Sequence, residues 1–216
     1  MVSNIKTAII VAIDGPAGAG KSTVGRALAE RLGLEYLDTG AMYRAMTFAA
    51  LRRGVVEGDL DEVAAMAPDV DISVADGEVV VDGVNATQAI RGREVTEAVS
   101  QVAANPGVRA VLVDRQRGWV AERGGGVVEG RDIGSVVFPD ADLKLFITAS
   151  PRTRAERRVM EIGGDVDEVE ASIIERDRKD SSREHSPLTE TDDAIVVDTT
   201  GLTVDEVLDR IMGLIP

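Results

Sequence analysis

Residues 15–22 have the types and spacing needed to hold the phosphates of a nucleoside triphosphate. Their sequence fits the pattern G-x-x-x-x-G-K-[ST]. Glycines let backbone N–H groups turn inward around an anion, and a helix that starts there adds its positive end. Lys21 is predicted to reach the β- and γ-phosphates, and the Ser22 hydroxyl to ligate Mg²⁺ that arrives with ATP. The predicted ATP-binding residues are Gly15, Pro16, Ala17, Gly18, Ala19, Gly20, Lys21, Ser22 and Thr23.

The segments on either side of this loop are those that a phosphate-binding loop requires. Thr7–Ile13 is a continuous apolar and β-branched run, which indicates a buried parallel strand. Lys21–Leu32 carries apolar residues at helical spacing. A chance match would not be expected to sit between such a strand and such a helix, so the motif predicts nucleotide binding.

A second strand and helix are predicted to bring an acceptor beside this loop. The second strand is predicted over Leu34–Asp38 and the helix over Ala41–Arg53. A strand end that opens onto a helix N-terminus is a natural site for a phosphate group. Arg44 lies about one turn into that helix and is predicted to bind the acceptor's phosphate.

Two classes of nucleotide-binding protein fit the loop, a hydrolysing switch or motor and a small-molecule kinase. A GTPase would need an Asn-Lys-x-Asp motif to read guanine, and the sequence has none. The stretch 198–201 matches a loose D-x-x-G pattern, but it follows the last predicted strand and is interpreted as a strand end and turn. The sequence therefore favours a kinase. A nucleotide-binding regulatory protein stays open and would consume ATP without phosphorylating any acceptor.

The rest of the chain alternates between strand and helix patterns, which predicts a three-layer α/β fold with a parallel central sheet. Further strands are predicted at Gly126–Glu129, Leu143–Thr148 and Ala194–Val197, a loop at Gly130–Phe138, and helices at Asp59–Pro68, Thr96–Ala104, Pro106–Glu122, from Pro151, at Val166–Arg183 and at Thr203–Met212. Asp71–Val84 reads as strand, turn, strand around Asp76-Gly77, a hairpin signal. We therefore expect one domain over 1–216 with a small antiparallel β insert at about 59–93.

The overall composition limits the kinds of binding partner that we expect. The 216 residues are 44% apolar and 3% aromatic, include no cysteine and carry a formal net charge of −14. Such an acidic chain is not expected to bind nucleic acid. Its first six residues lack the pattern of a signal peptide, and the apolar run 8–13 is far shorter than the roughly 20 residues that span a bilayer. We expect a monomer in the cytoplasm, with no membrane partner.

Four blocks in order along the chain resemble the bacterial cytidylate kinases. They are the phosphate loop from Asp14 to Thr23 together with Tyr36–Arg44, then Ser100–Arg109, then Glu129–Ala141, and finally Glu175–Arg183 running on to Pro187-Leu188. The hairpin insert also resembles the nucleotide-binding insert of that family. The resemblance covers nearly the whole chain and implies a P-loop kinase fold with a helical lid at about 151–187. It also implies transfer of the γ-phosphoryl of ATP to CMP or dCMP.

The resemblance also implies roles for individual residues. Four would surround the cytosine: Thr39, Ser100, Arg109 and Asp132. Arg44, Arg131 and Arg183 would clamp the CMP phosphate, and Arg176 with Asp180 would hold the ribose. Charge on the transferred phosphoryl group would be stabilised by Lys21, Arg131, Arg176 and Arg183. By the same resemblance, Arg178 and Lys179 would also belong to the lid that covers the phosphates.

The sequence departs from the family pattern at two positions and leaves some roles open. Glu129 stands where many members have Asp, and Thr39 where many have Ser. The carboxylate near Mg²⁺ stays undecided among Asp14, Asp38 and Glu129. A preference for UMP or AMP is the alternative within the kinases.

Two further groups of residues are expected to lie outside the chemistry. Arg154, Arg157 and Arg158 are expected at the surface of their helix, although one of them would be able to stack on adenine. His185 is the only histidine. We do not expect it to act as a base, because a phosphate monoester with a second pKa near 6 is already a nucleophile at neutral pH.

Overall fold

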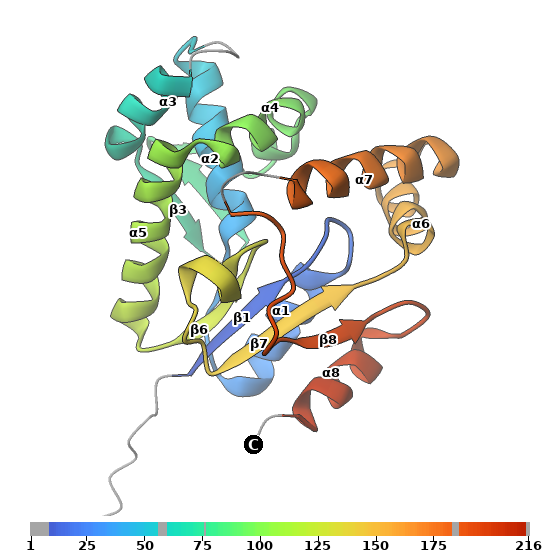
Figure 1. The fold of residues 1–216 in the computed structure, drawn as a ribbon. Coiled ribbons are helices and arrows are strands. Elements are labelled where there is room, and N and C mark those ends of the chain that lie inside the picture. Colours follow the sequence, from blue (N-terminus) through green and yellow to red (C-terminus); the bar gives the residue numbers. More distant parts are fainter. Residues whose placement is uncertain (1–8, 56–59, 76, 183–185, 215–216) are drawn as a thin grey trace, which may run out of the picture.

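A computed structural model describes residues 9–55, 60–75, 77–182 and 186–214, and its centre is a five-stranded parallel sheet (Figure 1). The strands are β1 (Ile10–Asp14), β2 (Tyr36–Asp38), β6 (Gly126–Glu129), β7 (Leu143–Thr148) and β8 (Ile195–Asp198). They lie in the order β2-β6-β1-β7-β8, and every neighbouring pair is parallel. The predicted parallel sheet is confirmed, and β1 and β6 end side by side at the same edge.

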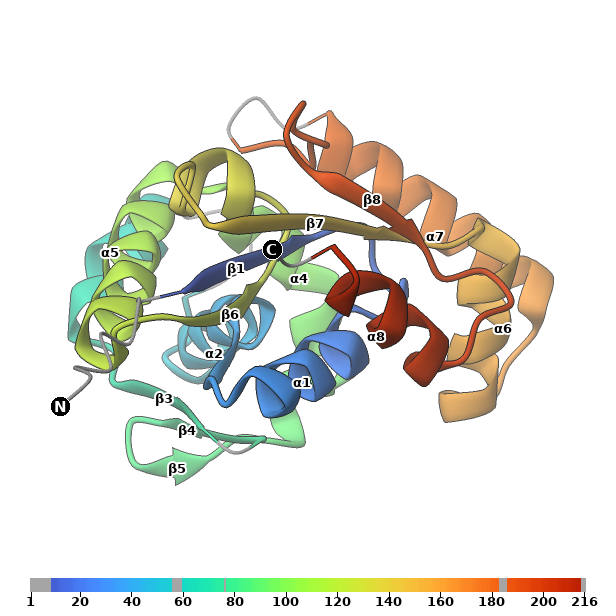
Figure 2. The ribbon, with the colours of Figure 1, turned by 90° about the horizontal axis from the view of Figure 1, so that it is seen from below.

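Helices cover both faces of this sheet because the strand residues alternate between them. Val11 and Ile13 of β1 pack on α1 (Lys21–Leu32) and α8 (Val204–Met212), which lie together on one side in Figure 2. Ala12 faces the other way, into a core that includes residues of α2 (Thr39–Arg52), α4 (Arg93–Ala104) and α5 (Pro106–Arg123). The three layers predicted from the sequence are therefore present.

A small second sheet follows α2. It is preceded by α3 (Leu60–Met66) and the short turn η1 (Ala67–Asp69), and it is followed by the short turn η2 (Ala89–Arg91). Its antiparallel strands are β3 (Ile72–Ala75), β4 (Glu78–Val81) and β5 (Val84–Asn85). Gly77 takes a φ of +81° in the turn between β3 and β4, as the hairpin signal predicts. β5 was not predicted, because two residues are too few to show an alternating pattern.

Two helices, α6 (Pro151–Ile162) and α7 (Val166–Ser181), lie beyond the carboxyl end of β7 (Figure 1). Each begins at a side-chain cap: Ser150 accepts from the N–H of Thr153, and Asp165 accepts from the N–H groups of the residues two and three positions on. Arg152 on α6 also pairs with Asp167 on α7. The caps fix where each helix begins, and the Arg152–Asp167 pair links the two helices at the surface.

One element differs from its prediction. The segment after β6 was expected to be a loop, but Ile133–Val137 forms a short π-helical turn, η3. The N–H of Val137 bonds the carbonyl of Asp132, and the N–H of Phe138 bonds that of Ile133, both five residues apart. Five residues are too few to show a helical period, so no local pattern indicates this turn.

The first glycine of the phosphate loop is expected to tolerate no side chain. Gly15 has a φ of +140°, and a Cβ there would lie 1.9 Å from the backbone oxygen of Ile147. We expect Gly15→Ala to lower the free energy of unfolding by about 3 kcal/mol, from backbone strain plus overpacking. Chemical denaturation would measure this change.

Gly33→Ala provides the matched control for that prediction. Gly33 has a φ of +65°, and no described atom lies within 4 Å of its added Cβ. Only backbone strain remains there, at about 1 kcal/mol. Equal losses in the two variants would contradict the steric explanation for Gly15.

Candidate active site

The phosphate loop joins β1 to α1 and presents an open helix start. Gly18 has a φ of +77°, and Gly20, the residue before α1, a φ of +91°. Gly20 has no side chain with which to cap the first turn, so the N–H groups of that turn are available to an anion. Lys21 is only 5% exposed, and its ammonium donates to the carbonyl of Pro16 at 2.9 Å.

The environment of Lys21 disfavours its positive charge until an anion arrives. Burial and, to a smaller extent, the positive charge of Arg131 together lower the pKa of the Lys21 ammonium to about 7. The carboxylates Glu129, Asp38 and Asp14 oppose these effects but do not cancel them. A bound polyphosphate supplies the missing negative charge, so the site favours such a ligand.

A serine and a glutamate face each other next to this lysine. The Ser22 hydroxyl donates to Glu129 Oε1 at 2.9 Å. The other oxygen, Glu129 Oε2, is buried and has no hydrogen-bond partner among the residues that the structure describes. Burial raises the pKa of Glu129. A carboxylate oxygen without a hydrogen-bond partner, next to a hydroxyl group, provides the oxygen ligands that Mg²⁺ prefers.

The other two candidate carboxylates are already used. Asp38 accepts from the N–H of Ala41 and so caps α2. Asp14 accepts from the N–H groups of Ile133 and Gly134. Within the described part of the chain, no three Asp, Glu or His side chains form a metal-binding cluster. The geometry therefore favours a metal held jointly by Ser22, Glu129 and the phosphates of a nucleotide.

Four cationic side chains form two interacting pairs, Arg44 with Arg176 and Arg131 with Lys21 of the loop. Arg44 donates to the carbonyl of Ile90 at 3.1 Å and to the Thr96 hydroxyl at 3.0 Å. Burial, followed by the positive charge of Arg176 on α7, lowers the pKa of Arg44 to about 10. Arg131 acts in the same way on Lys21. Mutual repulsion between the buried Lys21 and these half-buried arginines is relieved by an anion between them, as a phosphate acceptor would provide.

A buried ion pair lies beyond the end of β6. Arg109 of α5 donates to Asp132, and the two side chains are 9% and 7% exposed. The guanidinium also lies over the ring of Tyr43, 5.7 Å from its centroid. Because β6 and β1 are neighbours, this pair and the phosphate loop share one edge of the sheet.

The comparisons with known proteins agree with this arrangement. A family model described as cytidylate kinase matches residues 11–216. The chain belongs to the cytidylate kinase family. A cytidylate kinase of Streptomyces griseus is 48% identical over 220 residues, covering 99% of this chain and 95% of the relative. One from Limosilactobacillus fermentum is 48% identical over 216 residues, covering 96% and 95%.

Solved structures are similar at the level of the fold. A gluconokinase from Sinorhizobium meliloti aligns with a TM-score of 0.50 at 15% identity, covering 96% of this chain and 91% of that one. At this identity the likeness concerns the kinase fold alone. The cytidylate kinase assignment therefore rests on the family model and on the close relatives.

The structure connects two more predicted residues of this cytidylate kinase, Thr39 and Ser100, to the residues described above. Thr39 is buried and donates to the carbonyl of Glu129 at 2.7 Å. Ser100 is half-buried on α4, one turn after Thr96, so it lies on the helix face that contacts Arg44. Arg183 and His185 lie outside the described residues.

The predicted lid residues separate into two groups. Asp180 is 1% exposed and accepts from Arg131 at 3.1 Å, and it therefore joins α7 to the end of β6. Arg178 and Lys179 are exposed and pair with Glu175 on their own helix. These two are not brought into the site.

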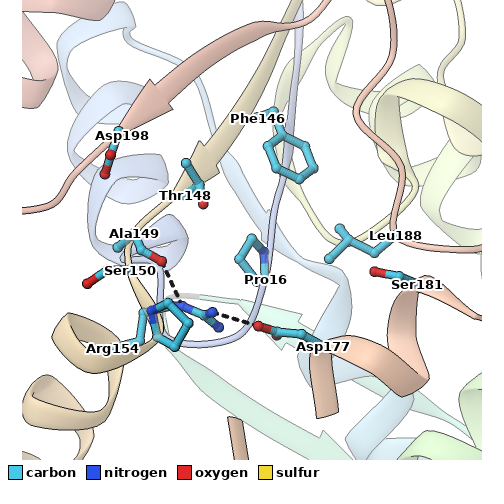
Figure 3. A pocket seen from close by; sticks show the side chains of 11 residues that line it. Pro16, Phe146, Thr148, Ala149, Ser150, Arg154, Asp177, Ser181, Leu188 and Asp198 are labelled. Atoms are coloured by element: carbon cyan, nitrogen blue, oxygen red, sulfur yellow. Dashed lines mark hydrogen bonds and ion pairs between the residues drawn. The ribbon is translucent and has the colours of Figure 1, made fainter. Parts of the chain in front are cut away.

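One expectation for α6 is wrong. Arg154 was expected at the surface but is 3% exposed. Its guanidinium donates to the carbonyl of Ala149 at 2.9 Å and to Asp177 at 2.6 Å. Figure 3 shows both contacts. The guanidinium also donates to the carbonyl of Ala17 in the phosphate loop at 3.1 Å. Buried carbonyls and a carboxylate satisfy the charge, which is why this arginine is tolerated inside the protein.

Arg154 also forms part of a cavity beside the loop. The cavity measures about 440 Å³ and is lined in part by Pro16, Phe146 and Leu188 (Figure 3). Arg157, the next arginine on α6, is half-buried and donates to the hydroxyl and carbonyl of Thr199 after β8. Arg158 is exposed, as expected.

Three residues that hold the site together were not singled out for these roles. Thr96 supports Arg44, Asp177 supports Arg154, and Asp14 supports the turn after Asp132. Thr96 is the first residue of the predicted helix that contains Ser100. Its place one turn before Ser100 puts it on the same helix face, and this spacing could have indicated its role. For Asp14 and Asp177 the partners are remote in sequence, and no local pattern indicates them.

Proposed function

We propose that the chain transfers the γ-phosphoryl of ATP to CMP and dCMP, giving ADP and CDP or dCDP, as part of pyrimidine nucleotide metabolism. The observation that carries this proposal is the buried Arg109–Asp132 pair at the sheet edge that also bears the phosphate loop. The names of the close relatives support the same acceptor.

The Arg109–Asp132 pair suits the edge of a cytosine. Cytosine presents an exocyclic amine as donor, and N3 and O2 as acceptors. A carboxylate accepts from the amine, and a guanidinium donates to the ring acceptors. Uracil carries a carbonyl in place of the amine, so the carboxylate would face an acceptor. Leaving a buried polar group without its partner costs about 1–3 kcal/mol, enough for useful discrimination.

The transfer itself requires positioning and charge stabilisation. The acceptor phosphate is largely dianionic at neutral pH, because the second pKa of such a monoester is near 6, so no general base is needed. Arg44 and Arg131, with Arg183, would hold the acceptor phosphate. Lys21 and Arg176 would stabilise charge on the moving phosphoryl group. Asp180, which accepts from Arg131, would hold the ribose together with Arg176.

Mg²⁺ belongs to this proposal, with Ser22 and Glu129 as the residues that would hold it. The ion would neutralise phosphate charge when bound. Ser22→Ala and Glu129→Gln are each expected to raise the Mg²⁺ concentration at half-maximal rate by about tenfold, because removal of even a partner of a metal ligand has this order of effect. Steady-state rates over a Mg²⁺ titration would measure the shift.

Asp38→Asn is the control for the Mg²⁺ titration. Asparagine caps a helix about as well as aspartate, so α2 keeps its start. Its titration curve should stay close to that of the wild type. If Asp38→Asn shifted the curve more than Glu129→Gln did, Asp38 would be the metal-holding carboxylate instead.

Closure of two segments over the substrates is part of the same proposal. The insert at about 59–93 would cover the acceptor, and the lid at about 151–187 would cover ATP. The lid already reaches the loop through Arg154, which contacts both Ala17 and Asp177. Closure would exclude water, which would otherwise hydrolyse the bound ATP.

The oligomeric state and the cellular location of the protein are proposed from the same expectations. We propose a monomer that works in the cytoplasm on small molecules. In the part of the chain that the structure describes, no helix is both long and apolar enough to cross a bilayer. The acidic net charge of −14 disfavours nucleic acid as a partner.

A coupled ADP-release assay tests the proposed function. It would contain ATP·Mg²⁺ and, in turn, CMP, dCMP, UMP, AMP, GMP and shikimate. Turnover with CMP and dCMP well above the others supports the proposal. Turnover mainly with UMP or AMP would reassign the acceptor, and ADP release with no phosphorylated acceptor would favour a regulatory nucleotide-binding protein.

A further inference from the structure

Asp14 is the last residue of β1 and directly precedes the phosphate loop. It is 6% exposed, and its two oxygens accept from consecutive backbone N–H groups. Oδ1 accepts from Ile133 at 2.8 Å, and Oδ2 accepts from Gly134 at 2.7 Å. A single buried carboxylate therefore joins two segments that lie about 120 positions apart in the sequence.

The two N–H groups begin the turn η3, immediately after Asp132. The carbonyl of Asp132 accepts from Val136 at 2.9 Å and from Val137 at 3.2 Å, so η3 also fixes the backbone of Asp132. That backbone is neither helical nor extended, with φ −144° and ψ 28°. The two hydrogen bonds of η3 hold Asp132 in this conformation.

We propose that Asp14 is a positioning residue for base recognition: it holds η3 against the end of β1, so that Asp132 meets Arg109 and the base at a fixed distance from the phosphate loop. In this proposal Asp14 acts through η3 and not by contact with either nucleotide. This inference rests on the proposed function, because it assumes that Asp132 and Arg109 read the acceptor's base.

The carboxylate is suited to this task in a way that an amide is not. Both of its oxygens accept, so each N–H has a partner. An asparagine at this position offers one oxygen, and its NH₂ group would face the second N–H. Burial raises the pKa of Asp14 to about 6 against the effect of these two hydrogen bonds, so the side chain remains mainly ionised at neutral pH.

The test compares Asp14→Asn with Asp142→Asn. Asp142 accepts from the N–H of Ile10 at 2.8 Å, so it makes the same kind of bond at the other end of β1, away from the site. For Asp14→Asn we expect the KM for CMP to rise and the preference for CMP over UMP to fall, each by about tenfold, with the KM for ATP unchanged within about twofold. For Asp142→Asn all three should stay at wild-type values.

A second variant covers the case in which Asp14→Asn does not fold. In Gly134→Ala the new Cβ would lie 3.4 Å from Asp14 Oδ2 and 3.1 Å from the side chain of Lys144, which must give way. The added methyl group would press η3 away from Asp14 and Lys144, so the CMP preference should fall by about threefold. Melting temperatures would establish that each variant is folded before its kinetics are compared.

Specific outcomes would overturn the inference. A wild-type preference for CMP over UMP in folded Asp14→Asn or, if that variant does not fold, in Gly134→Ala would overturn it. An equal rise in the KM values for CMP and ATP would also overturn it, because that pattern indicates general loosening. The wild type is run in the same assay. Failure of the proposed function would appear as no activity with CMP in the wild type itself, whereas failure of the role of Asp14 would appear only in the variants.

Discussion

Lys21→Met is expected to lower kcat by about 10²–10³-fold while the protein stays folded. Removal of one preorganised donor that faces developing charge has this order of effect in other enzymes. Methionine keeps a similar length and volume at a side chain that is 5% exposed. The rate would be measured with saturating ATP·Mg²⁺ and CMP.

The stability of this variant is a second readout. Burial holds the pKa of Lys21 near 7, far below its ordinary value, so the folded state disfavours the charged ammonium. We therefore expect the melting temperature of Lys21→Met to equal or exceed that of the wild type at pH 7. Loss of activity combined with unchanged or raised stability would indicate a residue kept for chemistry.

Lys179→Met is the control for this prediction. Lys179 is exposed and pairs with Glu175 on the surface of α7. Its replacement also removes one positive charge, but from the lid and not from the phosphate loop. It should change kcat by less than about twofold, since exposed ion pairs contribute little. More than a tenth of wild-type activity in Lys21→Met would refute the role assigned to Lys21.

Much of the central sheet could be predicted from the sequence. Gly126–Glu129 and Leu143–Thr148 have the predicted bounds, because buried parallel strands are continuous apolar runs between clear breaks. Lys21–Leu32 also has its predicted bounds, since a glycine precedes it and another follows it. The phosphate loop was predictable for a related reason: its chemistry lies within eight consecutive residues.

The contacts that hold the site could not be predicted in the same way. Arg154 was expected at the surface, since arginines usually are, and its partners Ala17 and Asp177 are 137 and 23 positions away. Asp14 and η3 are likewise joined by a contact that only the folded sheet creates. Local periodicity carries no information about such pairings, which depend on which strands become neighbours.

Asp132→Asn is expected to lower kcat/KM for CMP by about 10²-fold and to change that for UMP by less than about threefold. A hydrogen bond to an ionised group contributes about 1.5–3 kcal/mol, and 1.4 kcal/mol corresponds to a factor of ten. An asparagine can instead turn its NH₂ group towards the carbonyl of uracil. Steady-state kinetics with both acceptors would measure the change in preference.

Stability must be separated from recognition in this variant. Asp132 neutralises Arg109, and both are buried, so Asp132→Asn alone leaves a buried charge without its counter-ion and should lower the melting temperature. The double variant Arg109→Met/Asp132→Asn removes that charge and should recover much of the stability. If the pair reads the base, the double variant stays unable to prefer CMP. If the preference returned together with the stability, the pair would only support the fold, and the cytosine would have to be read elsewhere.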